Sequence, residues 1–277
     1  MKLYADLHIH TVHSDGEMSP AKIFEMANKI GLRAISITDH DTIDGCREAQ
    51  SLKEQYDIQF IDGVELSCHQ YGKEYHLLGY FIDIKNNSLL QHLDDFRTVR
   101  YKRALKMIEK IQRLGLDLSF EEVLEKAGDA PLTRPHFAKA MEEKGIVSSY
   151  REAFSLYLAE GKPCYEPKQQ FSITNAIKLI NDAEGVSVLA HPGKTLSQQT
   201  LYDIIELGID GIEVIHPSHD LELQKFYHNV CSQFWLLETG GSDFHGSRDY
   251  DYDNFGKYII PLSAVDSIRN HALNRLF

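Results

Sequence analysis

The chain has 277 residues, and its composition of 43% hydrophobic and 25% charged residues is ordinary for a globular protein with one large domain, or one domain and an insert. No apolar run approaches the ~20 residues that cross a bilayer, and the N-terminus lacks the apolar stretch of a signal peptide, so we expect a cytoplasmic protein with no membrane partner. The formal net charge of -12 argues against a protein that coats duplex DNA.

Short β-branched runs alternate with amphipathic stretches along most of the chain. In chain order, strands are predicted at 3–9, 34–38, 60–66, 76–82, 186–190, 211–215 and 236–240. Helices are predicted between them at 19–31, 43–55, 174–183, 197–207 and 221–231. Ser19 and Pro20 are suited to open the first helix, as its cap and its first residue. This alternation is typical of a parallel sheet covered by helices.

Residues 90–170 break this pattern. Strand signals nearly vanish there, and a long periodic helical run covers 90–114. We therefore expect a small helical insert domain at 96–170, carried on a barrel domain that is formed by 1–95 and 171–277.

Polar side chains stand where the predicted strands end, and many of them belong to the chain's 14 histidines. They are His8 and His10, Asp39 and His40, Glu65, His191, His216, and Asp243 with His245. A parallel α/β barrel carries its active site on the face where its strands end. This coincidence favours a barrel over an open sheet.

Single motifs allow a simpler interpretation as well. His8 and His10 lie two residues apart on a strand and can face one ion, but such pairs also occur as half-buried histidines. Asp15 lies in a predicted turn, where its carboxylate either reaches a metal or caps the turn. Asp39 and Asp41 either orient imidazoles or cap the next helix.

Glu65 ends an apolar strand, and its two oxygens suit it to bridge two ions. His76 is preferred to His69, which is expected in a polar loop, and His13 is left out as a loop histidine. The candidate metal ligands are His8, His10, Asp15, His40, Glu65, His76, His191, Asp243 and His245. Six imidazoles and three carboxylates exceed the needs of one ion and suit two or three divalent ions of zinc, manganese or iron.

The sequence resembles the polymerase-and-histidinol-phosphatase (PHP) family of metal-dependent phosphoesterases. The motifs that carry the resemblance are DLHIHTVHSDG at 6–16, ITDHDT at 37–42, GVELS at 63–67, AHPG at 190–193 and GSDFHG at 241–246. The resemblance implies a distorted (β/α)7 barrel with three metal sites. Their ligands would be His8, His10, Glu65 and Asp243 for the first ion, Glu65, His76 and His191 for the second, and Asp15, His40 and His245 for the third.

Two segments of the expected insert, LTRPHFA at 132–138 and GKPCY at 161–165, are similar to the insert of the 3',5'-nucleotide bisphosphate phosphatases. Members of that subgroup are also described as 5'-3' exoribonucleases. The resemblance implies a nucleotide bisphosphate, or short single-stranded RNA, as substrate. The candidate substrate-binding residues are Arg134 and Lys162, then Tyr165 and His136, and finally His219, which could hold phosphate or protonate the leaving oxygen. Without the resemblance, Arg134 and Lys162 would be interpreted as a solvated surface pair.

The predicted activity is therefore that of a phosphoric ester hydrolase acting through metal-activated hydroxide, with Glu65, Asp243 and His219 as catalytic residues. Three divalent ions and three carboxylates would leave the site with a formal charge of +3, which attracts phosphate. Two alternatives stay open. One is a histidinol-phosphate phosphatase, which is not expected to carry the insert, and the other is a metal-binding module without activity.

Overall fold

The structure, a computed structural model, describes residues 3–168, 170–248 and 250–275. The chain divides into two compact units. The barrel unit comprises Met1–Gln91 and Gln170–Phe277, and the helical unit comprises His92–Gln169. Among the residues described, no helix combines the length and apolarity that a membrane span requires.

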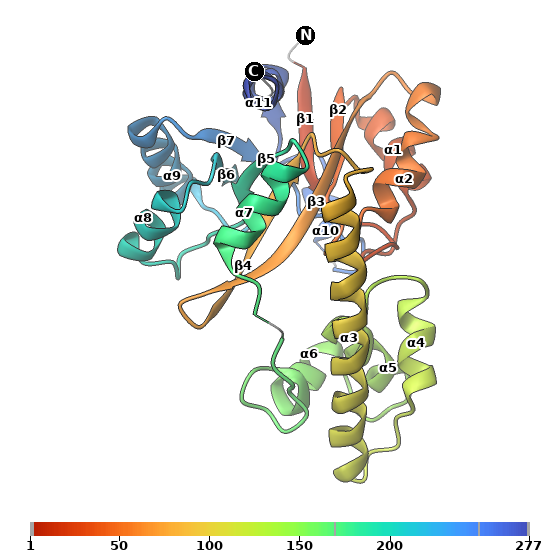
Figure 1. Cartoon of the computed structure of the whole chain (residues 1–277). Coiled ribbons are helices and arrows are strands. Elements are labelled where there is room, and N and C mark those ends of the chain that lie inside the picture. The colour runs from red at the N-terminus through yellow and green to blue at the C-terminus, as the bar shows by residue number, and fades with distance from the viewer. Residues whose placement is uncertain (1–2, 169, 249, 276–277) are drawn as a thin grey trace. The chain divides into compact units, whose positions relative to one another are not determined.

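The barrel unit is built on one eight-stranded sheet, in the order β7-β6-β5-β4-β3-β2-β1-β8 (Figure 1). The strands are β1 Tyr4–Ile9, β2 Ala34–Ile37, β3 Gln59–Gln70, β4 Lys73–Tyr80, β5 Val186–Leu189, β6 Gly211–Ile215, β7 Leu237–Gly240 and β8 Ile260–Pro261. β2 and β5 are buried at every position, as expected for strands with both faces covered.

The sheet is mixed, so the prediction of a parallel sheet is wrong for β4. The strand β8, which was not predicted, is antiparallel as well. β4 pairs antiparallel with both β3 and β5, and β8 pairs antiparallel with β1. The reason is a hairpin between β3 and β4, which turns at Tyr71 and Gly72, both with positive φ (50° and 74°). The hairpin extends β3 to Gln70, so His69 lies in a strand rather than in a polar loop.

The sheet closes on itself where the end of β1 meets the segment that follows β7. Ile9 forms a parallel bridge with Phe244, and the backbone N–H of His10 donates to the carbonyl of Phe244 at 2.9 Å. The sheet therefore forms a nearly closed barrel, which confirms the predicted α/β barrel class.

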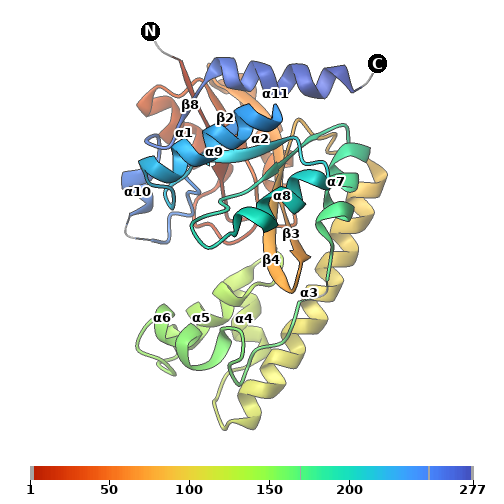
Figure 2. The same ribbon diagram turned by 90° about the vertical axis from the view of Figure 1, so that its left-hand side faces the viewer.

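Helices surround this barrel (Figures 1 and 2). They are α1 Pro20–Ile30, α2 Asp44–Gln50 with the 3-10 turn Lys53–Gln55, α7 Ile173–Asp182, α8 Gln198–Glu206, α9 Leu221–Phe234, α10 Asp251–Asn254 and α11 Leu262–Asn274. α1 begins as predicted, because the Ser19 side chain accepts from the Lys22 N–H and Pro20 follows the cap. Its C-cap Gly31 has a φ of 78°, a conformation that favours glycine.

α11 lies across one end of the sheet, beside the beginning of β1 (Figures 1 and 2). Val265 and Ile268 of α11 share a core cluster with Ala5 near the start of β1 and Val186 at the start of β5. Neither β8 nor α11 is predicted from the sequence. This helix covers the end where the strands begin, so the opposite end, where the strands finish, carries the candidate site.

The helical unit contains the larger part of α3. Its elements are α3 Asn87–Arg113, α4 Phe120–Ala127, α5 Arg134–Glu143, α6 Tyr150–Ala153 and a π-helical turn at Phe154–Leu158. Met107 and Ile111 of α3 pack in a common core with Val123 of α4 and with Phe137 and Met141 of α5.

Candidate metal centre

Histidine and carboxylate side chains converge at the end of the barrel where the parallel strands finish. They form five overlapping groups, and within each group the nitrogen and oxygen atoms lie within 4.8 Å of one another. The members are His8, His10, Asp15, His40, Glu65, His76, His191, Glu213, His216, Asp243 and His245. All nine residues predicted as ligands are in this set, which we call the cluster, and Glu213 and His216 are additional.

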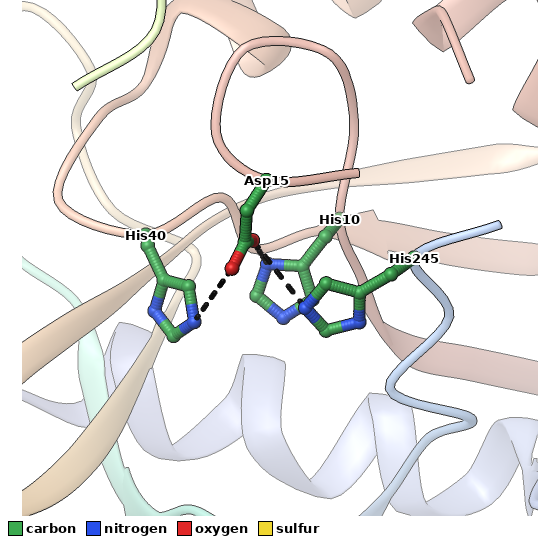
Figure 3. Close-up of side chains that lie close together, drawn as sticks. All are labelled: His10, Asp15, His40 and His245. Atoms are coloured by element: carbon green, nitrogen blue, oxygen red, sulfur yellow. Dashed lines mark ion pairs between the residues drawn. The ribbon is translucent and has the colours of Figure 1, made fainter. Parts of the chain in front are cut away.

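One group consists of His10, Asp15, His40 and His245 (Figure 3). Asp15 Oδ1 lies 3.3 Å from His245 Nε2 and 3.8 Å from His10 Nδ1, and Oδ2 lies 4.0 Å from His40 Nε2. Two ligands that share a tetrahedral ion at about 2.1 Å are roughly 3.4 Å apart. These separations are therefore suited to a shared cation.

Glu65 lies at the centre of the cluster and is fully buried. Its two oxygens face different imidazoles. Oε2 lies 3.3 Å from His8 Nε2, 3.2 Å from His10 Nε2 and 3.1 Å from His40 Nδ1, and Oε1 lies 3.0 Å from His76 Nδ1 and 2.9 Å from His191 Nε2. A single carboxylate thus stands between two sets of nitrogen donors, the arrangement that a bridging ligand requires.

Asp243 divides its oxygens in a similar way. Oδ1 lies 3.2 Å from His10 Nε2 and 3.5 Å from His8 Nε2. Oδ2 lies 3.6 Å from His216 Nε2 and 3.2 Å from Arg248 Nη1. The backbone of Asp243 has a φ of 50°, a left-handed conformation that turns the chain sharply after β7.

The electrostatics of the cluster keep its carboxylates ionised. Burial alone would raise the pKa of Asp15, Glu65 and Asp243, but the surrounding imidazoles hold each pKa well below its usual value. Burial lowers the pKa of His40 to about 3, despite the charges of Glu65 and Asp15. His40 is therefore neutral, the form in which an imidazole binds a metal.

Several buried polar atoms of the cluster lie close to their neighbours but form no hydrogen bond of suitable geometry within the part of the chain described. They are Asp15 Oδ1, Glu65 Oε2, His10 Nδ1, His40 Nδ1, His76 Nδ1 and His216 Nε2. Buried polar atoms normally have partners, because leaving one unsatisfied is destabilising. Divalent cations would satisfy the oxygens and unprotonated nitrogens of this set, so the residues present fit a metal centre.

Glu213, which was not predicted, is fully buried on β6. Its Oε1 lies 2.8 Å from His8 Nδ1, and its Oε2 accepts the backbone N–H of His191 at 2.8 Å. The contact with His8 Nδ1 leaves His8 Nε2 facing Glu65. The contact with the His191 N–H supports the unusual backbone φ of 26° at His191. The available signal was a glutamate inside an apolar strand, because such a residue is rarely buried without a partner.

Asp39 acts on the backbone of the first loop. It accepts from the N–H and the hydroxyl of Thr11, both at 2.7 Å, and from the hydroxyl of Ser14 at 2.6 Å. These bonds hold the loop that carries Asp15. Asp39 does not cap α2, whose N-cap residue Ile43 has no side-chain cap.

His13 and His69, set aside in the sequence analysis, are in none of the described metal-type groups. His13 instead pairs with Glu48 at 2.8 Å. His219 is also outside these groups, with Nδ1 donating to the Val214 carbonyl at 3.0 Å and Nε2 accepting the Gly193 N–H at 3.1 Å. Because backbone groups occupy both ring nitrogens, this geometry gives no support to its predicted role at the phosphate.

The other predicted substrate residues belong to the helical unit. Arg134 begins α5, and its guanidinium carbon lies 5.8 Å from the Phe154 ring centroid and 5.7 Å from that of Tyr165, within the range of cation–π contacts. His136 is buried and its Nδ1 caps the first turn of α5. Lys162 is exposed. Their roles in substrate binding stay predictions.

The chain is similar to several known proteins. The model of the PHP domain family matches residues 6–159. A 3',5'-nucleoside bisphosphate phosphatase of Chromobacterium violaceum is 32% identical over 254 residues, which cover 88% of this chain and 89% of that protein. A 5'-3' exoribonuclease of Haemophilus influenzae is 30% identical over 246 residues, which cover 87% of this chain and 89% of that protein. A crystal structure assigned as a metal-dependent phosphoesterase of Bifidobacterium adolescentis matches with a TM-score of 0.87 and 28% identity, over 95% of this chain and 94% of that one.

Proposed function

Since this chain belongs to the PHP domain family and is a metal-dependent phosphoesterase, we propose that it removes the 3'-phosphate of 3',5'-nucleotide bisphosphates, or nucleotides from the 5' end of short RNA. The observation that carries the proposal is the position of Glu65 between two sets of imidazoles. The substrate class is supported by the phosphatase and the exoribonuclease to which the chain is similar.

The cluster offers ligands for two or three divalent ions. We assign His8, His10, Glu65 and Asp243 to the first ion, Glu65, His76 and His191 to the second, and Asp15, His40 and His245 to the third. The groups of ligand atoms support the third set, which occurs together with His10, and the grouping of His8, His10 and Asp243 in the first. The second set is supported by Glu65 Oε1, which lies close to both His76 and His191. Imidazole and carboxylate donors suit zinc, manganese or iron.

When bound, the divalent ions supply an activated water molecule and stabilise negative charge on the phosphate oxygens. The protein's part is to hold the ions and orient the ester. Glu65 and Asp243 keep their charges in the buried site because nearby imidazoles hold their pKa values low. Glu213 is a fourth carboxylate, so the six positive charges of three divalent ions exceed the carboxylate charges by two rather than by the predicted three. The site still attracts an anionic phosphate.

The helical unit is close to neutral in formal charge, so it opposes a polyanionic substrate less than the acidic barrel unit does. The helical unit contains 14 basic and 13 acidic residues, whereas the barrel unit contains 15 basic and 28 acidic residues. The excess negative charge of the chain therefore lies in the barrel unit. We propose that Arg134, held between Phe154 and Tyr165, anchors the non-reacting phosphate, with Lys162 as an additional point charge.

A substrate comparison tests this proposal. Metal-loaded protein is assayed for phosphate release from 3'-phosphoadenosine 5'-phosphate and histidinol phosphate, and for nucleotide release from a short 5'-phosphorylated RNA. We expect the bisphosphate or the RNA to be hydrolysed with the highest kcat/KM. A preference for histidinol phosphate would overturn the substrate assignment, and a metal-loaded protein that hydrolyses no phosphate ester would overturn the function. The predicted cytoplasmic location stays a prediction.

A further inference from the structure

His216 follows the last residue of β6 and belongs to the cluster, yet it has no place in the ligand sets proposed above. Its side chain is buried, with a residue exposure of 5%. Nδ1 accepts the backbone N–H of Ser218 at 3.0 Å and also lies 2.8 Å from the Ser218 hydroxyl. Because Nδ1 accepts an N–H, it carries no proton, and the hydrogen-bond network therefore assigns the proton of the neutral ring to Nε2.

This Nε2–H group points into the cluster. It lies 3.6 Å from Asp243 Oδ2, which is too far for a hydrogen bond. Among the residues described, Nε2 is buried and has no hydrogen-bond partner. A buried donor without an acceptor is destabilising, so an acceptor that is not part of the chain is expected at this position.

A metal ion does not fill this role. His216 forms a group of ligand-type atoms with His8 and Glu213, but Glu213 already contacts His8 Nδ1 with one oxygen and the His191 N–H with the other. The nitrogen of His216 that faces the cluster carries a proton, so it has no lone pair for an ion. An oxygen atom with negative charge is an acceptor that suits this donor.

We propose that His216 Nε2–H donates a hydrogen bond to an oxygen of the phosphate group bound beside Asp243, in the ester substrate and in the inorganic phosphate product. The inference rests on the proposed function, because it takes the phosphate ester as the ligand of the cluster. An oriented donor in a buried site stabilises the charge that develops on that oxygen. His219, three residues later, cannot act in this way because its Nε2 accepts the Gly193 N–H.

The test compares His216→Ala, which removes the donor, with His216→Gln, which provides a side-chain N–H of similar reach. His228→Ala is the matched control, because His228 lies on α9 and its exposed side chain pairs only with Glu238 among the ion pairs found here. The measurements are metal content, the affinity of metal-loaded protein for inorganic phosphate by calorimetry, and kcat and KM for the preferred ester.

We expect every variant to keep the metal content of the wild type. His216→Ala should weaken phosphate binding at least about tenfold and lower kcat/KM about 100-fold, mainly through kcat, as for removal of one oriented donor. His216→Gln should recover at least about tenfold of that loss, and His228→Ala should behave as the wild type. If His216→Ala does not fold, His216→Phe replaces it, since it keeps a ring and lacks the donor.

Wild-type phosphate affinity in the variants without the donor would overturn the inference. Loss of metal in His216→Gln would also overturn it, because His216 would then be a ligand or a support of Asp243. Calorimetry needs no turnover, so it decides the inference even if the metal-loaded wild type hydrolyses no ester, the result that would overturn the proposed function instead.

Discussion

Glu213 Oε1 lies 2.8 Å from His8 Nδ1 and joins the middle of β6 to β1 inside the barrel. Both side chains are fully buried. The contact fixes the His8 ring so that Nε2 faces Glu65 and Asp243, at 3.3 and 3.5 Å. A carboxylate behind an imidazole in this way orients the ring toward an ion and increases its basicity.

Glu213→Gln should therefore weaken metal binding. A glutamine has only one oxygen for two donors, His8 Nδ1–H and the His191 N–H, so one donor would face an NH2 group. We expect a loss of about 10–100-fold in metal affinity, the usual effect of removing such a partner. Competition with a chelator measures the loss. The control is Glu206→Gln at the exposed end of α8, and equal affinities in the two variants would refute the role of Glu213.

Arg134→Ala should discriminate between substrates. If the guanidinium binds the non-reacting phosphate, kcat/KM should fall about 100-fold or more for a nucleotide bisphosphate, because a charge-assisted bidentate contact is lost. It should change little for p-nitrophenyl phosphate, which has a single phosphate. Arg151→Ala, on the exposed part of α6, serves as the control. Equal losses on the two substrates would count against the anchor.

The metal-free protein should lose stability at alkaline pH. Burial alone would lower the pKa of both His76 and His10. For His76 the negative charge of Glu65 outweighs burial and raises the pKa to about 9. For His10 the contacts with Asp243 and Glu65 outweigh burial and raise the pKa to about 10. A histidine with a raised folded-state pKa contributes stability that is fully present below its unfolded value of 6.5 and is lost as the pH rises through 9 and 10.

We therefore expect the free energy of unfolding of chelator-treated protein to fall by at least about 2 kcal/mol between pH 6.5 and pH 10. Urea unfolding at a series of pH values measures the fall. His76→Gln should make the profile shallower, because the variant lacks one of the two titrating rings. A stability that is constant or increasing over this interval would contradict the charge arrangement of the cluster.

Most residues of the cluster could be predicted because the signal was local, although β3 continues past Glu65 to Gln70. His8 lies near the end of β1 and His10 directly follows the strand, two residues later, and Glu65 ends an apolar run, so neighbouring residues alone indicate where the side chains point. The antiparallel β4 was missed, since a turn at Tyr71 and Gly72 lacks the Asn-Gly or Asp-Gly pattern that marks a hairpin most strongly. The assignment of 96–170 as an insert domain that binds substrate stays a prediction.

The supporting residues could not be predicted because their partners are distant in sequence. Glu213 contacts His8 across 205 positions, which only the folded barrel brings together. His219 was predicted to act at the phosphate and His216 was not, although both follow β6. The choice depends on which ring nitrogen meets a backbone N–H, and that is visible only in the folded loop.

The central claim is that the side chains on both sides of Glu65 would hold more than one divalent ion, and the metal content of the purified protein tests it most directly. Elemental analysis should find two or three ions of zinc, manganese or iron per folded chain of the wild type. Glu65→Gln should keep the fold but lose at least one ion, while Glu206→Gln keeps them all. A folded wild type that binds one ion or none after incubation with these metals, or a Glu65→Gln variant with the full complement, would contradict the account.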